Sequence, residues 1–142
     1  MVLVVNRSAL SFLSFVATLG ILALPVSGCS PDEPGAPSDL SAESRDGAVA
    51  TNWDASEGGV SGYNIYRSES PFEGTAGEKV NGSLVEGSSY VDQEVQNRTT
   101  YHYRVTAVTE SGGLLGIGGG SAESDPSNEV EKTPFSSPPD RP

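Results

Sequence analysis

Basic residues are scarce in this chain, in which eight Lys and Arg side chains stand against nineteen Asp and Glu, for a formal net charge of −11 over 142 residues. So acidic a surface repels phosphate backbones, which excludes nucleic acid as a partner. The acids are spread along the chain and do not form blocks. This spread indicates that the acidic side chains serve surface solvation, or hydration in a salty medium. It argues against a patch that binds a basic partner or divalent cations.

Cysteine and histidine occur once each, as Cys29 and His102. A single cysteine excludes an intramolecular disulfide, and no Gly-x-Ser-x-Gly elbow accompanies the histidine. His102 is expected on the outward face of a strand, between the inward-facing Tyr101 and Tyr103. Solvent or a cross-strand partner is a better interpretation of that position than a general base.

The sequence also lacks residues at the spacing that metal binding or catalysis by a carboxylate pair requires. Asp92 with Glu94, and Glu123 with Asp125, do not form the spaced ligand series of a calcium site. A small β-domain also offers no deep cleft in which one carboxyl of a glycosidase pair could have its pKa raised. We therefore expect no enzyme, no catalytic residue, no metal and no cofactor.

No apolar run is long enough to span a membrane. The run from Ala9 to Leu24 has about 16 residues, is interrupted by Gly20 and is followed by Pro25, whereas a spanning helix needs roughly 20 residues. Because Arg7 precedes this run, it has the pattern of a secretory signal peptide over residues 1–28.

Small residues lead to the cysteine at the end of this segment. Val26-Ser27-Gly28-Cys29 resembles a bacterial lipobox, which implies cleavage before Cys29 and acylation of its thiol by a diacylglyceryl group, with an amide-linked third chain in many bacteria. Alternatives are a secretory peptide cut elsewhere, which leaves a free thiol, and a membrane-spanning anchor. Ser30, where aspartate would favour inner-membrane retention, indicates the outer membrane if the cell has two.

The signal thus predicts a bacterial envelope protein whose domain lies outside the cytoplasm, with the membrane as a partner through the N-terminal lipid. Removing residues 1–28 removes Arg7 and no acid, which leaves seven basic residues against nineteen acidic ones and a net charge of −12. Composition divides the mature chain into a lipidated cysteine with a flexible linker at 29–36, one domain at 37–134, and a disordered proline-rich tail at 135–142.

Short β-like runs separated by turn residues fill this domain, with no helical period. We expect an all-β, seven-stranded, two-sheet antiparallel sandwich of the immunoglobulin-like class, monomeric in solution. The expected strands cover residues 38–42, 48–53, 62–67, 79–85, 88–92, 100–108 and 128–133. Alternation within them predicts the core residues Trp53, Tyr63, Ile65, Tyr90, Tyr101, Tyr103 and Val105. Tyr66 is the aromatic residue expected on the outer face, and one exposed ring is too little for a carbohydrate platform.

Six short segments together resemble the fibronectin type III family, in the form found in bacterial surface proteins and secreted hydrolases. They are Pro37-Ser38-Asp39-Leu40, Trp53, Gly62-Tyr63-Asn64-Ile65-Tyr66-Arg67-Ser68, Ser89-Tyr90-Val91-Asp92, Val95-Gln96-Asn97-Arg98-Thr99-Thr100-Tyr101, and Glu123 to Val130. The resemblance implies that Tyr101 forms a tyrosine corner, its hydroxyl bonding the backbone near Val95.

One loop departs from the family pattern. Residues 110–122 form a glycine-rich insertion that carries Leu114, Leu115 and Ile117. These residues either fold back to cap the sandwich or prolong a hairpin, or they form an exposed apolar tip that binds a partner protein or a membrane surface.

We therefore expect a non-catalytic, lipid-anchored envelope protein whose domain mediates binding or adhesion to an unknown envelope or extracellular protein, through the loop at 110–122. One alternative is a structural or accessory subunit, or a spacer, recruited to a larger complex by sheet-edge pairing. An accessory role in a secreted, carbohydrate-active hydrolase is a further alternative.

Overall fold

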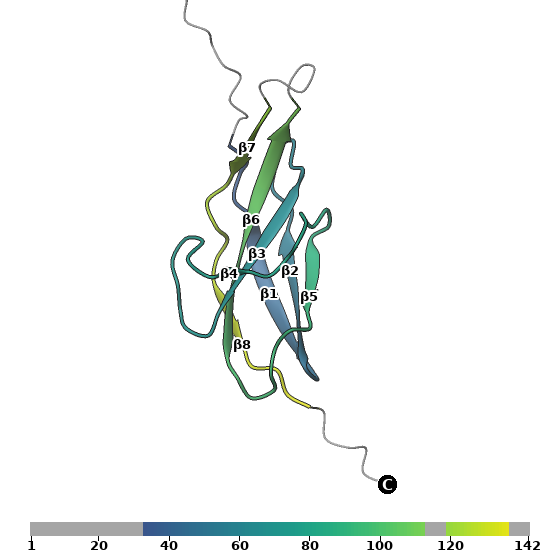
Figure 1. Cartoon of the computed structure of the whole chain (residues 1–142), viewed down its shortest axis with the longest axis vertical. Coiled ribbons are helices and arrows are strands. Elements are labelled where there is room, and N and C mark those ends of the chain that lie inside the picture. The colour runs from purple at the N-terminus through teal and green to yellow at the C-terminus, as the bar shows by residue number, and fades with distance from the viewer. Residues whose placement is uncertain (1–32, 113–118, 137–142) are drawn as a thin grey trace, which may run out of the picture.

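Two antiparallel β-sheets packed against each other make up the structure, a computed structural model that describes residues 33–112 and 119–136 (Figure 1). The smaller sheet has the order β1–β2–β5, with β1 at Ser38–Arg45, β2 at Ala48–Asp54 and β5 at Ser89–Asp92. The larger sheet has the order β4–β3–β6–β7, and β8 also pairs with β6. Its strands are β4 at Glu78–Lys79, β3 at Gly62–Ser68, β6 at Tyr101–Ser111, β7 at Gly120–Glu123 and β8 at Val130–Lys132.

The expected all-β sandwich is therefore confirmed, and it has eight strands where seven were expected. The strand that was not expected is β7, which pairs with β6 and falls mostly within the loop expected at 110–122, whereas β8 lies within the strand expected at 128–133. Over the two described stretches of chain, no helix is long and apolar enough to cross a membrane.

Alternate residues of the two sheets meet in one core, as the period-two pattern requires. The buried cluster consists of Leu40, Val49, Trp53, Tyr63, Ile65, Val95, Tyr101, Tyr103, Val105 and Ala107. Trp53 and Tyr63 make an edge-to-face contact with ring centroids 5.3 Å apart. Tyr90 is half-buried against this cluster, and its hydroxyl donates a hydrogen bond to the Val80 carbonyl at 3.1 Å.

The tyrosine corner is present at the start of β6. The backbone N–H of Gln96 donates to the Tyr101 hydroxyl at 3.1 Å, one residue after the position that the family resemblance implied. This bond ties the crossing between the sheets to the strand that follows it.

The outer face of the larger sheet differs from the sequence expectation. Tyr66 and His102 do face away from the core, yet Tyr66 is 8% exposed and His102 is 7% exposed. Tyr66 lies between its register partners Lys79 and Arg104, and its hydroxyl donates a hydrogen bond to Glu123. The expectation of an exposed Tyr66 was therefore wrong.

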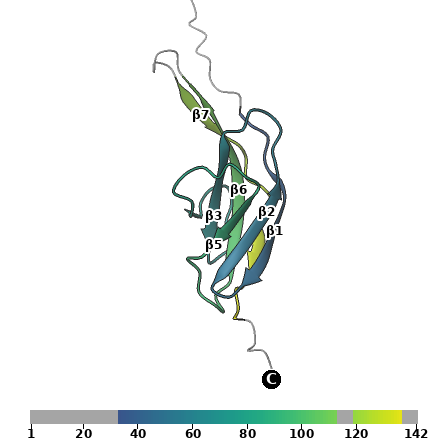
Figure 2. The same ribbon diagram turned by 90° about the vertical axis from the view of Figure 1, so that its right-hand side faces the viewer.

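The stretch before β1 has buried residues. Pro34, assigned from composition to the flexible linker, is buried. The N-terminal stretch runs along β7 at one end of the sandwich, and the C-terminal stretch leaves beyond β8 at the other end (Figures 1 and 2). At that second end the Pro134 carbonyl accepts a hydrogen bond from the Arg98 N–H at 2.8 Å.

Candidate interaction surface

The β6–β7 hairpin projects beyond the rest of the larger sheet. The last β6 residue paired to β3 is Val108, opposite Gly62, while β6 and β7 continue to pair up to Ser111 opposite Gly120. Three β6 residues past Val108 therefore pair with β7 alone. Figure 2 shows the two arms rising past the end of β3. Such a projection offers side chains and strand edges to a partner without disturbing the core.

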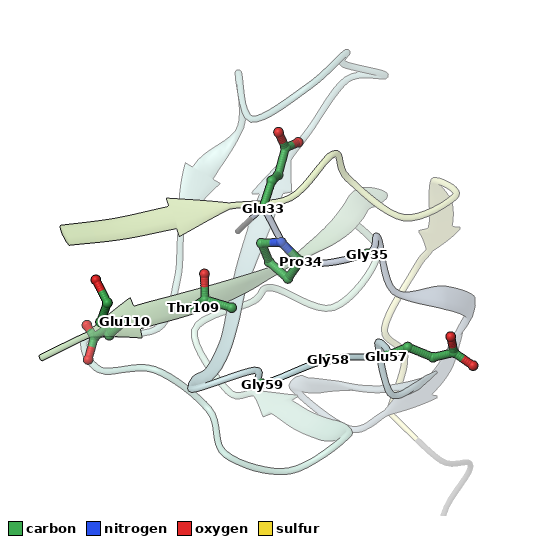
Figure 3. A pocket seen from close by; sticks show the side chains of 9 residues that line it. Glu33, Pro34, Gly35, Glu57, Gly58, Gly59, Thr109 and Glu110 are labelled. Atoms are coloured by element: carbon green, nitrogen blue, oxygen red, sulfur yellow. The ribbon is translucent and has the colours of Figure 1, made fainter. Parts of the chain in front are cut away.

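The N-terminal stretch lies at the base of this hairpin. Glu33, Pro34 and Gly35 line one side of an open hollow of about 370 Å³, and Thr109, Glu110 and Ser111 line another (Figure 3). Its remaining lining comes from the loop Glu57, Gly58 and Gly59 after β2. Gly58 has φ +104°, a backbone conformation that favours glycine, so the shape of this loop depends on glycine at that position. Three carboxylates of this end, those of Glu33, Glu57 and Glu110, make it acidic.

A hydrogen-bond network covers the outer face of the larger sheet near the hairpin. The Oε1 atom of Glu123 on β7 accepts hydrogen bonds from Asn64 Nδ2 at 3.1 Å, from the Tyr66 hydroxyl at 2.8 Å and from the Thr106 hydroxyl. An open hollow of about 530 Å³ lies over Asn64, Glu123 and the neighbouring Lys79.

Near pH 7 the network contains one charged group, the Glu123 carboxylate, and one neutral group, the Tyr66 phenol. Burial would raise the pKa of Glu123, but the hydrogen bonds from Thr106, Asn64 and Tyr66 outweigh it and hold that pKa below its usual value. Burial, together with the hydrogen bond and charge of Glu123, raises the pKa of Tyr66 to about 12. The pKa of the carboxyl is lowered and the pKa of the phenol is raised, so both move away from pH 7 and the two groups do not exchange a proton there. The network therefore fits a fixed surface better than acid–base chemistry.

His102 lies in a second polar cluster, at the far part of the same face. Its Nδ1 is 3.2 Å from Glu129 Oε1, while Glu129 Oε2 accepts from Arg104 Nε at 3.4 Å and from the Phe72 N–H at 3.1 Å. The Arg104 guanidinium lies 5.7 Å from the centre of the Phe72 ring. Burial would raise the pKa of Glu129, but the Phe72 N–H and Arg104 lower it. The single histidine thus pairs with a carboxylate of the segment just before β8, and this cluster fastens the loop after β3 to the sheet.

The residues singled out from the sequence for lipidation and for binding are Cys29, Leu114, Leu115 and Ile117, and they lie outside the described residues. Within residues 33–112 and 119–136, no group of three or more His, Cys, Asp or Glu is arranged to hold a metal ion.

Sequence reasoning missed the contribution of Glu33, Pro34 and the loop 57–59 to this end of the molecule. They line one hollow with Thr109–Ser111, which lie at least 50 positions away in the chain, and local composition carries no signal for such a meeting. The one available signal was the glycine pair after β2, which marks a loop that needs an unusual backbone conformation.

Known proteins match this chain over the folded region. The sequence pattern of the fibronectin type III domain matches residues 35–129. Amylopullulanase from Thermoanaerobacterium saccharolyticum is 38% identical over 96 residues, and amylopullulanase from Thermoanaerobacter thermohydrosulfuricus is 42% identical over 96 residues. These alignments cover 68% of this chain but only 7% and 6% of the two enzymes, so the chain spans less than a tenth of their length.

Solved structures show the same fold. A fibronectin type III-like protein from Clostridium thermocellum superposes with a TM-score of 0.55 at 24% identity, over 76% of this chain and 98% of that one. A β-1,2-glucanase from Parabacteroides distasonis gives a TM-score of 0.55 at 23% identity, over 79% of this chain and 14% of the enzyme.

Proposed function

Because this chain belongs to the fibronectin type III family, we propose that it is a non-catalytic binding domain of a bacterial cell envelope, held outside the cytoplasm by acyl chains on Cys29. Domains of this family are typically non-catalytic, and the matched amylopullulanases share only a small part of their length with it. In this proposal residues 1–28 are a signal peptide and the described domain is the mature, exported part.

The projecting β6–β7 hairpin is the observation that carries the binding proposal. Its arms extend three residues past β3, and they end at the glycine-rich insertion whose sequence includes Leu114, Leu115 and Ile117. Apolar residues gathered at one place on an otherwise acidic chain are typical of a docking site. We propose these three as the contacts of the loop 110–122 with a protein or a surface.

Sugar stacking has less support than binding through the hairpin. The rings of Trp53, Tyr63, Tyr101 and Tyr103 are buried in the core, and Tyr66 is covered by its neighbours. Rings in these positions cannot stack on a saccharide.

The proposal is tested by cross-linking capture from a native envelope extract. The bait is residues 30–142, as wild type and as the variant Leu114→Ser/Leu115→Ser, after circular dichroism shows that both fold. Val91→Ser is the matched control, because Val91 is an exposed apolar residue (39%) on β5, away from the hairpin. The expected result is one partner captured by wild type and by Val91→Ser but not by the double variant. Failure to capture any partner contradicts the proposal.

An accessory or spacer role is the second candidate. It is favoured by the amylopullulanase matches, in which this type of domain is a small part of a large enzyme, and by the positions of the described N- and C-terminal stretches at opposite ends of the sandwich (Figure 1). Under this role, the double variant and wild type would capture the same partner, through a sheet face or edge.

A further inference from the structure

One edge of the smaller sheet has no strand beside it. In the order β1–β2–β5, the two outer edges belong to β1 and β5. The edge of β1 is covered at Leu40, whose backbone N–H and C=O groups both hydrogen-bond the Asn128 side chain at 3.0 Å. Among the residues that the structure describes, β5 pairs with β2 alone. An uncovered strand edge is a template for pairing with another chain.

The register of β5 identifies the backbone groups on this outer edge. The Trp53 N–H donates to the Ser88 carbonyl at 3.1 Å, so these two residues form a hydrogen-bonded pair of the antiparallel ladder. Such pairs recur at every second residue, so Tyr90 also directs its backbone groups toward β2. The N–H and C=O groups of Ser89 and Val91 therefore point to the outer edge, and both residues are exposed.

The residues between them fasten β5 to the rest of the sandwich. The Tyr90 hydroxyl donates to the Val80 carbonyl at 3.1 Å, and the Tyr90 carbonyl accepts from the Thr51 hydroxyl at 3.2 Å. Asp92 accepts from the Arg67 guanidinium at 2.8 Å. The edge is thus held extended before a partner arrives, which lowers the entropic cost of adding a strand to it.

The charge around β5 favours a basic partner. From residue 80 to residue 97 the chain has three acidic residues and no Lys or Arg. Two of the three, Glu86 and Glu94, are exposed and lie on either side of β5 in the chain, with the exposed apolar Val91 between them. The same edge of a second copy would bring like charges together, which is unfavourable, whereas basic residues would be attracted.

We propose that the outer edge of β5 binds an extended, basic segment of a partner protein, which pairs with Ser89 and Val91 as a fourth strand of the smaller sheet. Main-chain hydrogen bonds supply the affinity, and Val91 packs against an apolar side chain of the segment. Basic residues at the two ends of the segment meet Glu86 and Glu94. This surface is additional to the hairpin, and it depends neither on the hairpin contact nor on acylation of Cys29.

The test measures binding of the peptide Lys-Thr-Val-Thr-Val-Lys, with a fluorophore at its N-terminus, to the full chain in phosphatidylcholine nanodiscs. Val91→Pro is the central variant, because the Val91 N–H points away from β2 and proline there removes no bond of the existing ladder. We expect Val91→Pro to weaken binding by about tenfold or more. Val91→Thr keeps the N–H and should stay within about threefold of wild type.

Two further comparisons separate backbone pairing from charge. Glu86→Gln/Glu94→Gln should weaken binding several-fold, because each carboxylate attracts one lysine of the peptide. Glu57→Gln/Glu131→Gln removes two exposed carboxylates that are distant from β5 in the chain, and it should leave binding unchanged. A peptide methylated on its backbone nitrogens should not bind, and this result tests the main-chain hydrogen bonds without changing the protein.

Hydrogen exchange locates the bound peptide. Binding should slow exchange at the Ser89 and Val91 amides and leave the Tyr90 amide, which is directed toward β2, unchanged. Equal binding by wild type and Val91→Pro, or no binding to either, overturns the proposal. A chain that dimerises without peptide, and loses its dimers in Val91→Pro, makes a second copy the occupant of the edge and also overturns it. Each of these failures leaves the hairpin proposal standing.

Discussion

Arg67 on β3 contacts side chains from several other parts of the sandwich. Its side chain reaches from β3 to Asp92 Oδ2 at 2.8 Å and to Glu78 Oε2 at 3.1 Å, and its guanidinium lies 5.5 Å from the centre of the Tyr101 ring. Asp92 also accepts the Tyr103 hydroxyl at 3.1 Å. Burial, and then the charge and hydrogen bond of Asp92, raise the pKa of Tyr103, so it stays neutral and donates.

The two acidic partners of Arg67 differ in burial, which predicts different effects of their removal. The Asp92 side chain is 2% exposed and that of Glu78 is 73% exposed. Asp92→Asn leaves the half-buried Arg67 guanidinium without its main partner and should lower the free energy of unfolding by about 3 kcal/mol. Glu78→Gln should lower it by less than about 1 kcal/mol. Urea unfolding of the two variants checks this, and equal losses would contradict it.

Glu123 predicts an acid dependence of stability. Its pKa is below the ordinary value in the folded state, because hydrogen bonds from Thr106, Asn64 and Tyr66 favour the charged form. A depressed folded pKa contributes stability above the unfolded pKa, and that contribution is lost as pH falls through the folded pKa. Glu123→Gln should therefore flatten the decline of the thermal midpoint below about pH 4.3. Glu131→Gln, at an exposed position on β8, is the control and should leave the decline unchanged.

At the scale of elements, the break between β7 and β8 is held by two serine side chains. Ser124 Oγ accepts the Ala107 N–H at 2.9 Å, and Ser127 Oγ accepts the Val105 N–H at 3.1 Å. The backbone N–H groups of the same serines donate back to the Ala107 and Val105 carbonyls. The edge of β6 thus stays hydrogen-bonded across the irregular stretch, where Pro126 could not donate.

Loss of these hydroxyls should open that edge. Ser124→Ala/Ser127→Ala leaves two buried N–H groups of β6 without acceptors, which should lower the free energy of unfolding by about 1–3 kcal/mol per group. Hydrogen exchange should show faster exchange at Val105 and Ala107. Ser121→Ala, on exposed β7, should change neither measurement, and unchanged protection in the double variant would contradict the role given to the serines.

Strand β6 shows what the alternation pattern can and cannot predict. The pattern correctly assigned Tyr101, Tyr103 and Val105 to the core, because inward residues repeat every two positions. Burial of His102 on the opposite face could not be predicted, because its cover comes from Glu129 and the loop that carries Phe72. Those contacts join residues 27 and more positions apart.

At the scale of the whole molecule, charge is the dominant property. The mature chain predicted from the sequence has seven basic and nineteen acidic residues, and an excess of one sign destabilises a compact state through self-repulsion. The thermal midpoint of residues 30–142 should therefore rise by a few degrees as NaCl is raised from low ionic strength, since salt screens exposed charges. Differential scanning calorimetry across a salt series checks this, and a falling midpoint would contradict it.

The sequence by itself determined the all-β class, most of the strands and the aromatic core, because each depends on period-two alternation. The tyrosine corner followed from the resemblance to the fibronectin type III family. Only the tertiary structure decided that Tyr66 is covered, that Pro34 is packed, and that the hairpin arms and the N-terminal stretch share one end. These features depend on side chains meeting across sheets and loops from distant parts of the chain. Local sequence patterns do not encode contacts between distant residues, because such contacts follow from how the two sheets pack.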